Sequence, residues 1–317
     1  MLSAQTLLQE LENNIAKAIV GKDEAVELLF NALLCGGHVL IEDVPGVGKT
    51  TLASAFARSL ALSFKRIQFT PDVTPSDVTG YSVMDFKTGD MSFKQGAVFS
   101  NLLLADEINR TSPKTQSSLL EVMQEGQVTT DGVTRLMPQP FMVLATQNPV
   151  DFVGTYPLPE AQLDRFFMRI EIGYPSREEE LKVLEMYRGA KRRVEEVEPI
   201  CDGGDILELQ QQVTQVKVSK EMRLYITNIA QASRSAKLFG RGISTRGAIA
   251  LMRAAQAGAL MEGRDYVMPE DVRALAAPVL AHRLSLSPEA RISQKNASEA
   301  KALTRLIASL PVPVRAK

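Results

Sequence analysis

The chain has 317 residues, of which 45% are hydrophobic and 23% are charged. This length and balance are ordinary for a soluble globular protein and predict one large domain or, better, two. The 36 Lys and Arg residues are matched by 37 Asp and Glu, and a formal charge of −1 argues against a protein that follows a nucleic-acid backbone.

The cysteines, histidines and apolar runs exclude further classes of protein. Cys35 and Cys201 have no second cysteine near them, so neither a disulfide framework nor a Cys-rich zinc site is expected. His38 and His282 are far apart in the sequence and are expected to be structural. No apolar run is long enough to cross a bilayer, and the acidic residues at the N-terminus do not fit a signal peptide. We therefore expect a cytoplasmic location.

Helices and strands alternate along the first part of the chain. Two helices are expected before residue 35, the first with an apolar stripe at helical spacing. Strands are predicted at 38–41, 66–69, 101–105, 141–146 and 166–172, with helices at 49–60 and 113–125. This alternation predicts an α/β fold with a parallel five-stranded sheet covered on both faces.

Two hairpins are predicted as insertions into this alternation. The first lies at about 72–97 and has a polar turn at 87–90. The second lies at about 126–138, where Asp131 and Gly132 separate two alternating strands. An Asp-Gly pair in this setting is a strong signal for a tight hairpin turn.

The composition changes near residue 190. Charged residues are followed by a Gly- and Asp-rich stretch, which we interpret as a linker at 191–205. Only helices are predicted after it, at 206–216, 220–234, 245–260, 269–281 and 298–310. Pro269 is expected to begin a helix and Ser298 to cap the last one. The sequence therefore predicts a core at 1–190 and an all-helical lid at 206–317.

A phosphate-binding loop is predicted directly after the first strand, at Gly46-Val47-Gly48-Lys49-Thr50. Glycines let backbone N–H groups turn toward phosphate oxygens, and the N-terminus of the following helix adds partial positive charge. Lys49 is expected to reach the β- and γ-phosphates of a nucleotide, and the Thr50 hydroxyl to ligate Mg²⁺. A chance Gly-Lys-Thr turn is the alternative, which the strand before and the helix after disfavour.

The loop departs from the strict pattern at its first position, where Asp43 replaces glycine. Asp tolerates left-handed backbone angles better than most residues, so the loop is still expected to form.

Acidic and polar residues follow two of the later strands. Asp106 and Glu107 end an apolar strand, where ligands bind in open α/β sheets. Asp106 is expected to hold the Mg²⁺ shell and Glu107 to orient or polarise the attacking water. Asn148 follows strand 141–146 and is a candidate to bind the water or the γ-phosphate, although a simple Asn-Pro turn explains it equally well.

Three arginines are candidates for contacts with a nucleotide. Arg165 and Arg169 lie at the edge of the predicted core, where an arginine could enter a neighbouring subunit's site. Ion pairs with Asp164 or Glu171 are the alternative. Arg246 begins a lid helix, a position that does not favour a cation, and could contact the γ-phosphate.

Taken in order, these elements resemble the AAA+ ATPases and, within them, the MoxR family. The resemblance implies the role of sensor-1 for Asn148, arginine finger for Arg165 and sensor-2 for Arg246, with Arg110 and Arg169 as alternative fingers. It explains the two hairpins as an insert in helix 2 and a hairpin before sensor-1. It implies catalytic residues Glu107, Asn148, Arg165 and Arg246, metal ligands Thr50 and Asp106, and nucleotide contacts Val20, Gly21, Pro45, Gly46, Val47, Gly48, Lys49, Thr50 and Thr51. The segments that carry it are 19–21, 42–50, 105–110, 145–149, 160–166 and 270–272.

The resemblance further implies a function in a ring, most simply a hexamer, with ATP and Mg²⁺ bound between subunits. Such proteins are regarded as chaperone-like ATPases that mature protein complexes or insert metal cofactors, often beside a partner with a von Willebrand factor A domain. Two alternatives stay open: a nucleic-acid motor, which the weakly basic hairpin turns disfavour, and a nucleotide-gated binding module with little turnover.

Overall fold

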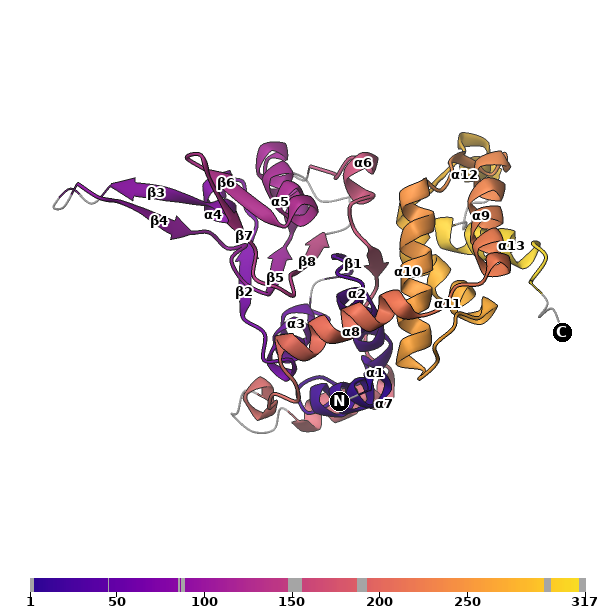
Figure 1. Ribbon diagram of the computed structural model, residues 1–317, viewed down its shortest axis with the longest axis horizontal. Coiled ribbons are helices and arrows are strands. Elements are labelled where there is room, and N and C mark those ends of the chain that lie inside the picture. Colours follow the sequence, from indigo (N-terminus) through magenta and orange to yellow (C-terminus); the bar gives the residue numbers. More distant parts are fainter. Residues whose placement is uncertain are drawn as a thin grey trace.

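The computed structural model describes residues 3–44, 46–84, 86, 89–147, 156–186, 193–293 and 298–313. An α/β body carries a projecting hairpin on one side and a group of helices on the other (Figure 1). None of the helices in the described ranges is both long enough and apolar enough to span a membrane.

Two helices open the chain and cover one side of the body. Helix α1 (Ala4–Ile15) begins after Ser3, whose side chain accepts a hydrogen bond from the Thr6 N–H. Helix α2 (Asp23–Leu34) has two acidic residues in its first turn, where the helix dipole favours negative charge. Both helices bury their apolar faces in the same cluster as helix α3 (Lys49–Ser59).

The predicted parallel five-stranded sheet is confirmed. Its strands lie in the order β2-β5-β8-β1-β9, and every neighbouring pair is parallel. The strands are β1 (Val39–Glu42), β2 (Phe64–Gln68), β5 (Leu102–Asp106), β8 (Met142–Gln147) and β9 (Met168–Ile170).

Alternate residues of the inner strand β5, which lies between β2 and β8, face the two helical layers. Leu102 and Leu104 pack with α3 in one hydrophobic cluster, whereas Leu103 and Ala105 pack in a second cluster with α5 (Pro113–Glu125). Because successive side chains in a strand point to opposite faces, Asp106 belongs to the face that α3 covers.

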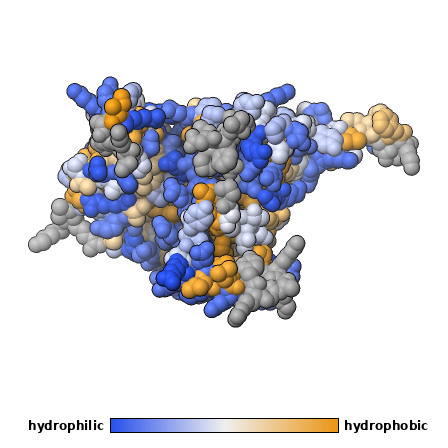
Figure 2. All heavy atoms as spheres, turned by 180° about the vertical axis from the view of Figure 1, so that it is seen from behind, coloured by the Kyte–Doolittle hydropathy of each residue, from blue (hydrophilic) through white to orange (hydrophobic). Residues whose placement is uncertain are grey.

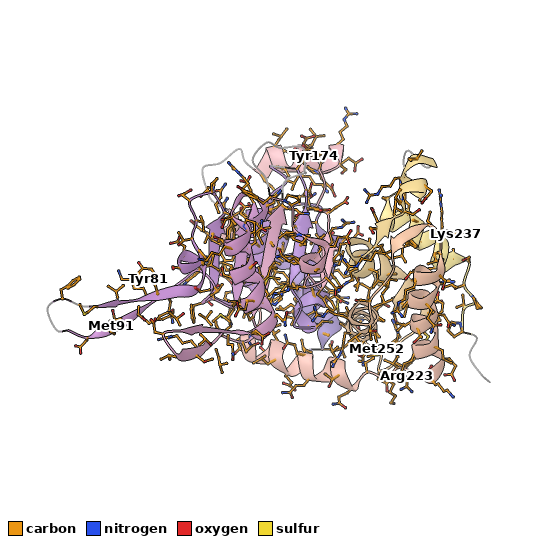
Figure 3. All side chains as sticks on the ribbon, turned by 90° about the horizontal axis from the view of Figure 1, so that it is seen from above. Tyr81, Met91, Tyr174, Arg223, Lys237 and Met252 are labelled. Atoms are coloured by element: carbon orange, nitrogen blue, oxygen red, sulfur yellow. The ribbon has the colours of Figure 1, made fainter. Side chains whose placement is uncertain are left out.

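Both predicted hairpins are present. After the short helix α4 (Pro75–Thr79), strands β3 (Gly80–Met84) and β4 (Met91–Gln95) form an antiparallel arm that projects from the body in two views (Figures 1 and 3). Positions 87 and 88 of its predicted turn lie outside the described residues.

The second hairpin contains the predicted Asp-Gly turn. Strands β6 (Gln127–Thr130) and β7 (Val133–Leu136) flank Asp131 and Gly132, which have φ values of 53° and 74°. The Arg135 guanidinium lies 3.8 Å from the centroid of the Phe93 ring, so the second hairpin braces the first.

The predicted helical lid follows, and short caps explain where its helices begin. Ser219, Ser244 and Ser298 each accept a hydrogen bond from a backbone N–H in the first turn of the helix they precede. A short antiparallel pair, β10 (Phe239–Arg241) and β11 (Ser285–Leu286), lies between the helices. The helices after the sheet are α6 (Glu160–Leu163), α7 (Arg177–Met186), α8 (Gly203–Gln215), α9 (Lys220–Ser235), α10 (Thr245–Met261), α11 (Pro269–Leu280), α12 (Pro288–Ser293) and α13 (Glu299–Ala308).

Helix α8 connects the body to the lid. It begins at Gly203, within the predicted linker, and the Gln210 Nε2 donates to the Leu33 carbonyl of α2 at 2.7 Å. It also packs against α10, and its apolar residues join the cluster that runs from α1 to α13. The division of the chain at 190 and 205 stays a prediction.

A buried arginine fixes the lid to the edge of the sheet. Arg283, which is only 3% exposed, forms an ion pair with Asp164 and donates to the Phe166 carbonyl at 2.7 Å. Closer to the surface, Arg241 pairs with Glu160 at 3.2 Å. Both acidic partners lie on the segment that leads into β9. The lid is therefore held beside the end of the sheet where β9 begins.

Candidate functional site

The phosphate loop connects the end of β1 to the start of α3. Gly46 and Gly48 have φ values of 89° and 91°, which side chains with a Cβ rarely adopt, so both glycines are required by the turn. Helix α3 begins at Lys49 with neither a side-chain cap nor an acidic residue in its first turn. Its N-terminal N–H groups and dipole can therefore bind an anion.

The predicted nucleotide contacts surround this turn. Lys49 Nζ donates to the carbonyls of Asp43 and Val44 at 3.0 and 3.1 Å, so its ammonium is held at the loop. Thr50 and Thr51 are half-buried in the first turn of α3, and Val47 is buried. Pro45 lies outside the described residues.

Asp43 has a different task from the one its sequence suggests. It is not among the described residues with positive φ, so tolerance of left-handed angles does not explain it. Its Oδ2 accepts hydrogen bonds from the Ile172 and Gly173 N–H groups at 2.7 and 2.6 Å, and its Oδ1 accepts from the Val44 N–H at 2.8 Å. The side chain ties the start of the phosphate loop to the segment after β9.

The turn between α1 and α2 also touches the loop. A Cβ on Gly48 would lie 2.7 Å from Ile19 Cδ1, so the missing side chain lets Ile19 pack there. Gly21 has a φ of 69°, and a Cβ on it would clash with the Glu179 carboxylate. Val20 and Gly21, the predicted nucleotide contacts, are therefore next to a residue that touches the loop.

The acidic pair lies at the carboxyl end of β5. Asp106 is buried, and Glu107 has a φ of 55°, a left-handed conformation that costs energy for a residue other than glycine. Thr146 of β8 holds both residues, because its hydroxyl donates to Asp106 Oδ1 at 2.6 Å and accepts from the Glu107 N–H at 2.8 Å. The sequence did not predict this role for Thr146.

Two arginines contact the acidic pair, and the sequence analysis predicted neither contact. Arg66 Nη2 of β2 lies 2.6 Å from Asp106 Oδ2. Arg110 Nη1 lies 2.7 Å from Glu107 Oε2. Each carboxylate of the acidic pair therefore has a cation beside it.

The side chains present fit a hard cation such as Mg²⁺. Asp106 lies on the sheet face covered by α3, whose first turn carries the Thr50 hydroxyl, and both offer oxygen ligands. Among the described residues, no three His, Cys, Asp or Glu side chains group into a metal site. A small number of protein ligands is typical of Mg²⁺ sites in which nucleotide phosphates and water supply the remaining ligands.

Asn148 lies outside the described residues. The preceding residue, Gln147, donates to Glu42 at the end of β1, and Glu42 also pairs with Arg169 at 3.0 Å. These bonds join three neighbouring strands, β8, β1 and β9, beside the phosphate loop.

Arg165 and Arg246 line one cavity of about 330 Å³ between the sheet edge and the lid. Arg165 precedes β9, and Met168 of β9 lies opposite Val39, the first residue of β1. Arg165 thus lies at the end of the sheet where β1 begins. The phosphate loop lies at the other end of β1, about 13 Å away along the strand. The structure brings the two arginines together, but not to the phosphate loop of the same chain.

The charged residues that line this cavity are four arginines and one acid, Asp164, which is paired with Arg283. Arg246 and Arg253 lie two turns apart on α10, both are exposed, and neither has a side-chain hydrogen bond or ion pair within the described part of the chain. Arg165 Nη1 donates to the Leu120 carbonyl at 2.9 Å. Burial lowers the pKa of His38, which also lines the cavity, to about 4, so this histidine is neutral. Such a surface suits an anionic ligand.

A larger cavity, of about 670 Å³, lies in the lid and contains none of the predicted site residues. It is formed by the segments around Val218 and Val267 together with Pro313.

Comparison with known proteins agrees with an α/β ATPase body followed by a lid. Residues 38–168 match the family described as the ATPase family associated with various cellular activities, and residues 231–303 match the AAA lid domain. A crystal structure of a protein from Cytophaga hutchinsonii superposes with a TM-score of 0.91 and 38% identity, covering 98% of this chain and 96% of that one.

Three curated relatives cover most of the chain. The uncharacterized protein YeaC of Bacillus subtilis is 48% identical, over 98% of this chain and 96% of its own length. Chaperone MoxR1 of Mycobacterium tuberculosis is 42% identical, over 87% of this chain and 75% of its own length. Protein MoxR of Paracoccus denitrificans is 31% identical, over 96% of both chains.

Proposed function

Because the chain belongs to the MoxR family of AAA+ ATPases, we propose that it hydrolyses Mg·ATP at sites completed by a neighbouring copy in a ring, and remodels partner proteins. The observation that carries this proposal is the separation of Arg165 and Arg246 from the phosphate loop of their own chain. Arginines that face away from their own loop can serve the loop of a neighbour.

Within one subunit, the proposal gives each residue of the site a task. Lys49 and the N-terminal N–H groups of α3 bind the phosphates, and Glu107 orients and polarises the attacking water. Asn148 is proposed to hold that water or the γ-phosphate from the neighbouring strand. Thr50 and Asp106 would hold Mg²⁺, which supplies charge neutralisation on the phosphate oxygens.

Between subunits, Arg165 is the strongest candidate for the arginine finger. Arg110 and Arg169, the alternatives, are already paired within the chain with Glu107 and Glu42. Within the described residues the Arg165 guanidinium forms no ion pair; it donates to a backbone carbonyl and lines a cavity with Arg246. An arginine supplied in this way stabilises transition-state charge and is worth roughly 10³–10⁵ in rate. For Arg246, a candidate for a contact with the γ-phosphate, we therefore propose that this γ-phosphate is bound by a neighbouring subunit.

A protein is the proposed client. The projecting arm exposes large apolar side chains, and Figure 2 shows an apolar surface at its end. These exposed apolar side chains are Tyr81, Met84, Phe86 and Met91. A nucleic-acid strand would be met by a basic surface instead, so this observation favours a protein remodeller over a nucleic-acid motor.

The broader assembly rests on the family. A hexameric ring and a partner with a von Willebrand factor A domain are proposals, and chaperone activity is the function named for the relative in Mycobacterium tuberculosis. A cytoplasmic location, where ATP is available, stays a prediction.

The deciding experiment measures ATP turnover per subunit against protein concentration, with Glu107→Gln as the blank. We expect turnover per subunit to rise steeply with concentration, because a neighbour completes each site. A measurable turnover that is independent of concentration would rule out the proposed contacts between subunits. Tight ATP binding with no turnover above the blank would instead support the nucleotide-gated module.

A further inference from the structure

Arg66 forms an ion pair with Asp106, the acidic residue proposed to hold the metal. The side chains lie on adjacent strands, and Arg66 Nη2 is 2.6 Å from Asp106 Oδ2. The second carboxylate oxygen, Oδ1, accepts the hydrogen bond from Thr146. Both oxygens of Asp106 therefore have a donor within the protein.

The position of Arg66 in the sheet explains why it reaches this carboxylate. Strand β2 pairs with β5 so that Arg66 lies opposite Leu104 and Gln68 opposite Asp106. Leu104 and Asp106 face α3, and Arg66 is on the same face. The guanidinium thus lies on the side of the sheet where α3 presents Lys49 and Thr50.

The two members of the pair are exposed to very different extents. The Asp106 side chain is 13% exposed, whereas that of Arg66 is 42% exposed. A largely buried carboxylate needs a cation or hydrogen-bond donors beside it, while an arginine at the edge of the sheet is able to move into solvent. The exchangeable member of the pair is therefore Arg66.

We propose that Arg66 is a positioning residue that competes with Mg²⁺ for Asp106. It neutralises and orients the carboxylate in the absence of the metal, and it must be displaced from Oδ2, at least in part, when the metal binds. A positive charge within a few ångströms of a divalent cation disfavours its binding. Arg66 thereby raises the Mg²⁺ concentration at which the site fills, a role that rests on the proposed nucleotide site.

The test follows nucleotide binding rather than turnover. Binding of a nonhydrolysable ATP analogue to the full-length protein is measured by calorimetry at a series of Mg²⁺ concentrations. For Arg66→Ala we expect the Mg²⁺ midpoint to fall about tenfold, which corresponds to about 1.4 kcal/mol. Arg66→Lys, which keeps the charge, should stay closer to the wild type.

Lys65→Ala is the matched control. Lys65 is the adjacent residue on β2, points to the opposite face and donates to the Gly96 carbonyl at 3.2 Å, so its removal should leave the Mg²⁺ midpoint unchanged. Urea unfolding of each variant shows whether it is folded before its midpoint is compared.

Each outcome decides a different point. An unchanged midpoint in folded Arg66→Ala overturns the inference and reduces the pair to a surface contact. A raised midpoint also overturns it, because Arg66 would then help Asp106 to bind the metal. Wild-type binding that does not depend on Mg²⁺ would overturn the proposed Mg·ATP site itself, along with this inference.

Discussion

The Thr146 hydroxyl donates to Asp106 Oδ1 at 2.6 Å and thereby joins the ends of β8 and β5 at the proposed hydrolysis site. Thr146 Oγ1 also accepts a hydrogen bond from the Glu107 N–H, which helps to hold Glu107 in its left-handed conformation. We expect Thr146→Val to retain ATP binding and lower turnover about 10–100-fold, the range seen when partners of metal ligands are removed. Thr146→Ser keeps the hydroxyl and should retain most activity. Equal turnover in the two variants would show that the hydrogen bonds do not matter.

Glu107→Gln tests the proposed role of the carboxylate itself. Glutamine has nearly the same shape but cannot accept a proton, so we expect ATP affinity to stay within about twofold and turnover to fall about 10²–10⁴-fold. The measurements are calorimetric ATP binding and phosphate release. Glu178→Gln, an exposed residue on α7, is the control and should behave like the wild type. Undiminished turnover in Glu107→Gln would remove this residue from the mechanism.

The phosphate loop, the strands and the Asp-Gly turn could be predicted because each depends on a short, continuous stretch of sequence. Thr146 and Arg66 could not, because their contacts with Asp106 depend on the spatial order of β2, β5 and β8 and on the register between them. A strand order is a property of the whole fold, and no local motif carries it.

The placement of the lid shows the same limit. The sequence made Arg246 a candidate for a contact with the γ-phosphate but did not say of which subunit. The lid is held by Arg283, which contacts Asp164 from 119 residues away. That buried pair fixes the lid at the end of the sheet where β9 begins, which is the end opposite the phosphate loop. The side on which a lid docks depends on such long-range contacts, which helical periodicity alone does not reveal.

Mixed assemblies test whether Arg165 acts on a neighbour. A subunit with Arg165→Ala keeps its own phosphate loop and should bind ATP, but it leaves the adjacent subunit's site without its arginine. We expect turnover in mixtures with wild-type subunits to differ from the sum of the separate activities, falling below it where wild-type sites lie beside variant subunits. Arg223→Ala, an exposed arginine on α9, should give additive activity. Additive activity with Arg165→Ala would exclude a finger that acts between subunits.

Asp43→Gly should destabilise the protein although it restores the strict phosphate-loop pattern. The change removes the carboxylate that accepts hydrogen bonds from the Ile172 and Gly173 N–H groups. Hydrogen bonds to charged groups contribute about 1.5–3 kcal/mol each, so we expect the loss of these two to lower the free energy of unfolding in urea by about 3–6 kcal/mol. Asp131→Gly makes the same replacement where φ is 53° and should be neutral or slightly stabilising. A similar effect at both positions would mean that Asp43 does not tie the loop to β9.

Stability should decrease as the pH falls below about 6.5, because His38 is buried as a neutral side chain. Its Nε2 donates to the Met123 carbonyl at 2.9 Å, and its Nδ1 accepts the Val143 N–H at 3.0 Å, so protonation of Nδ1 would break a bond. Burial lowers the pKa of His38 from 6.5 to about 4, and burial is also the main cause that lowers the pKa of His282 to about 3.

The sign of the effect follows from which state binds the proton. Between about pH 6.5 and 4 the unfolded chain protonates His38 and the folded chain does not, so the unfolded state gains stability by up to about 1.4 kcal/mol per pH unit. The measurement is the free energy of unfolding in urea at about pH 7.5, 6 and 5. His38→Gln keeps a donor and an acceptor but does not titrate, and it should be less stable at the highest pH yet lose stability less steeply. Parallel pH profiles for the variant and the wild type would show that His38 is not the group responsible.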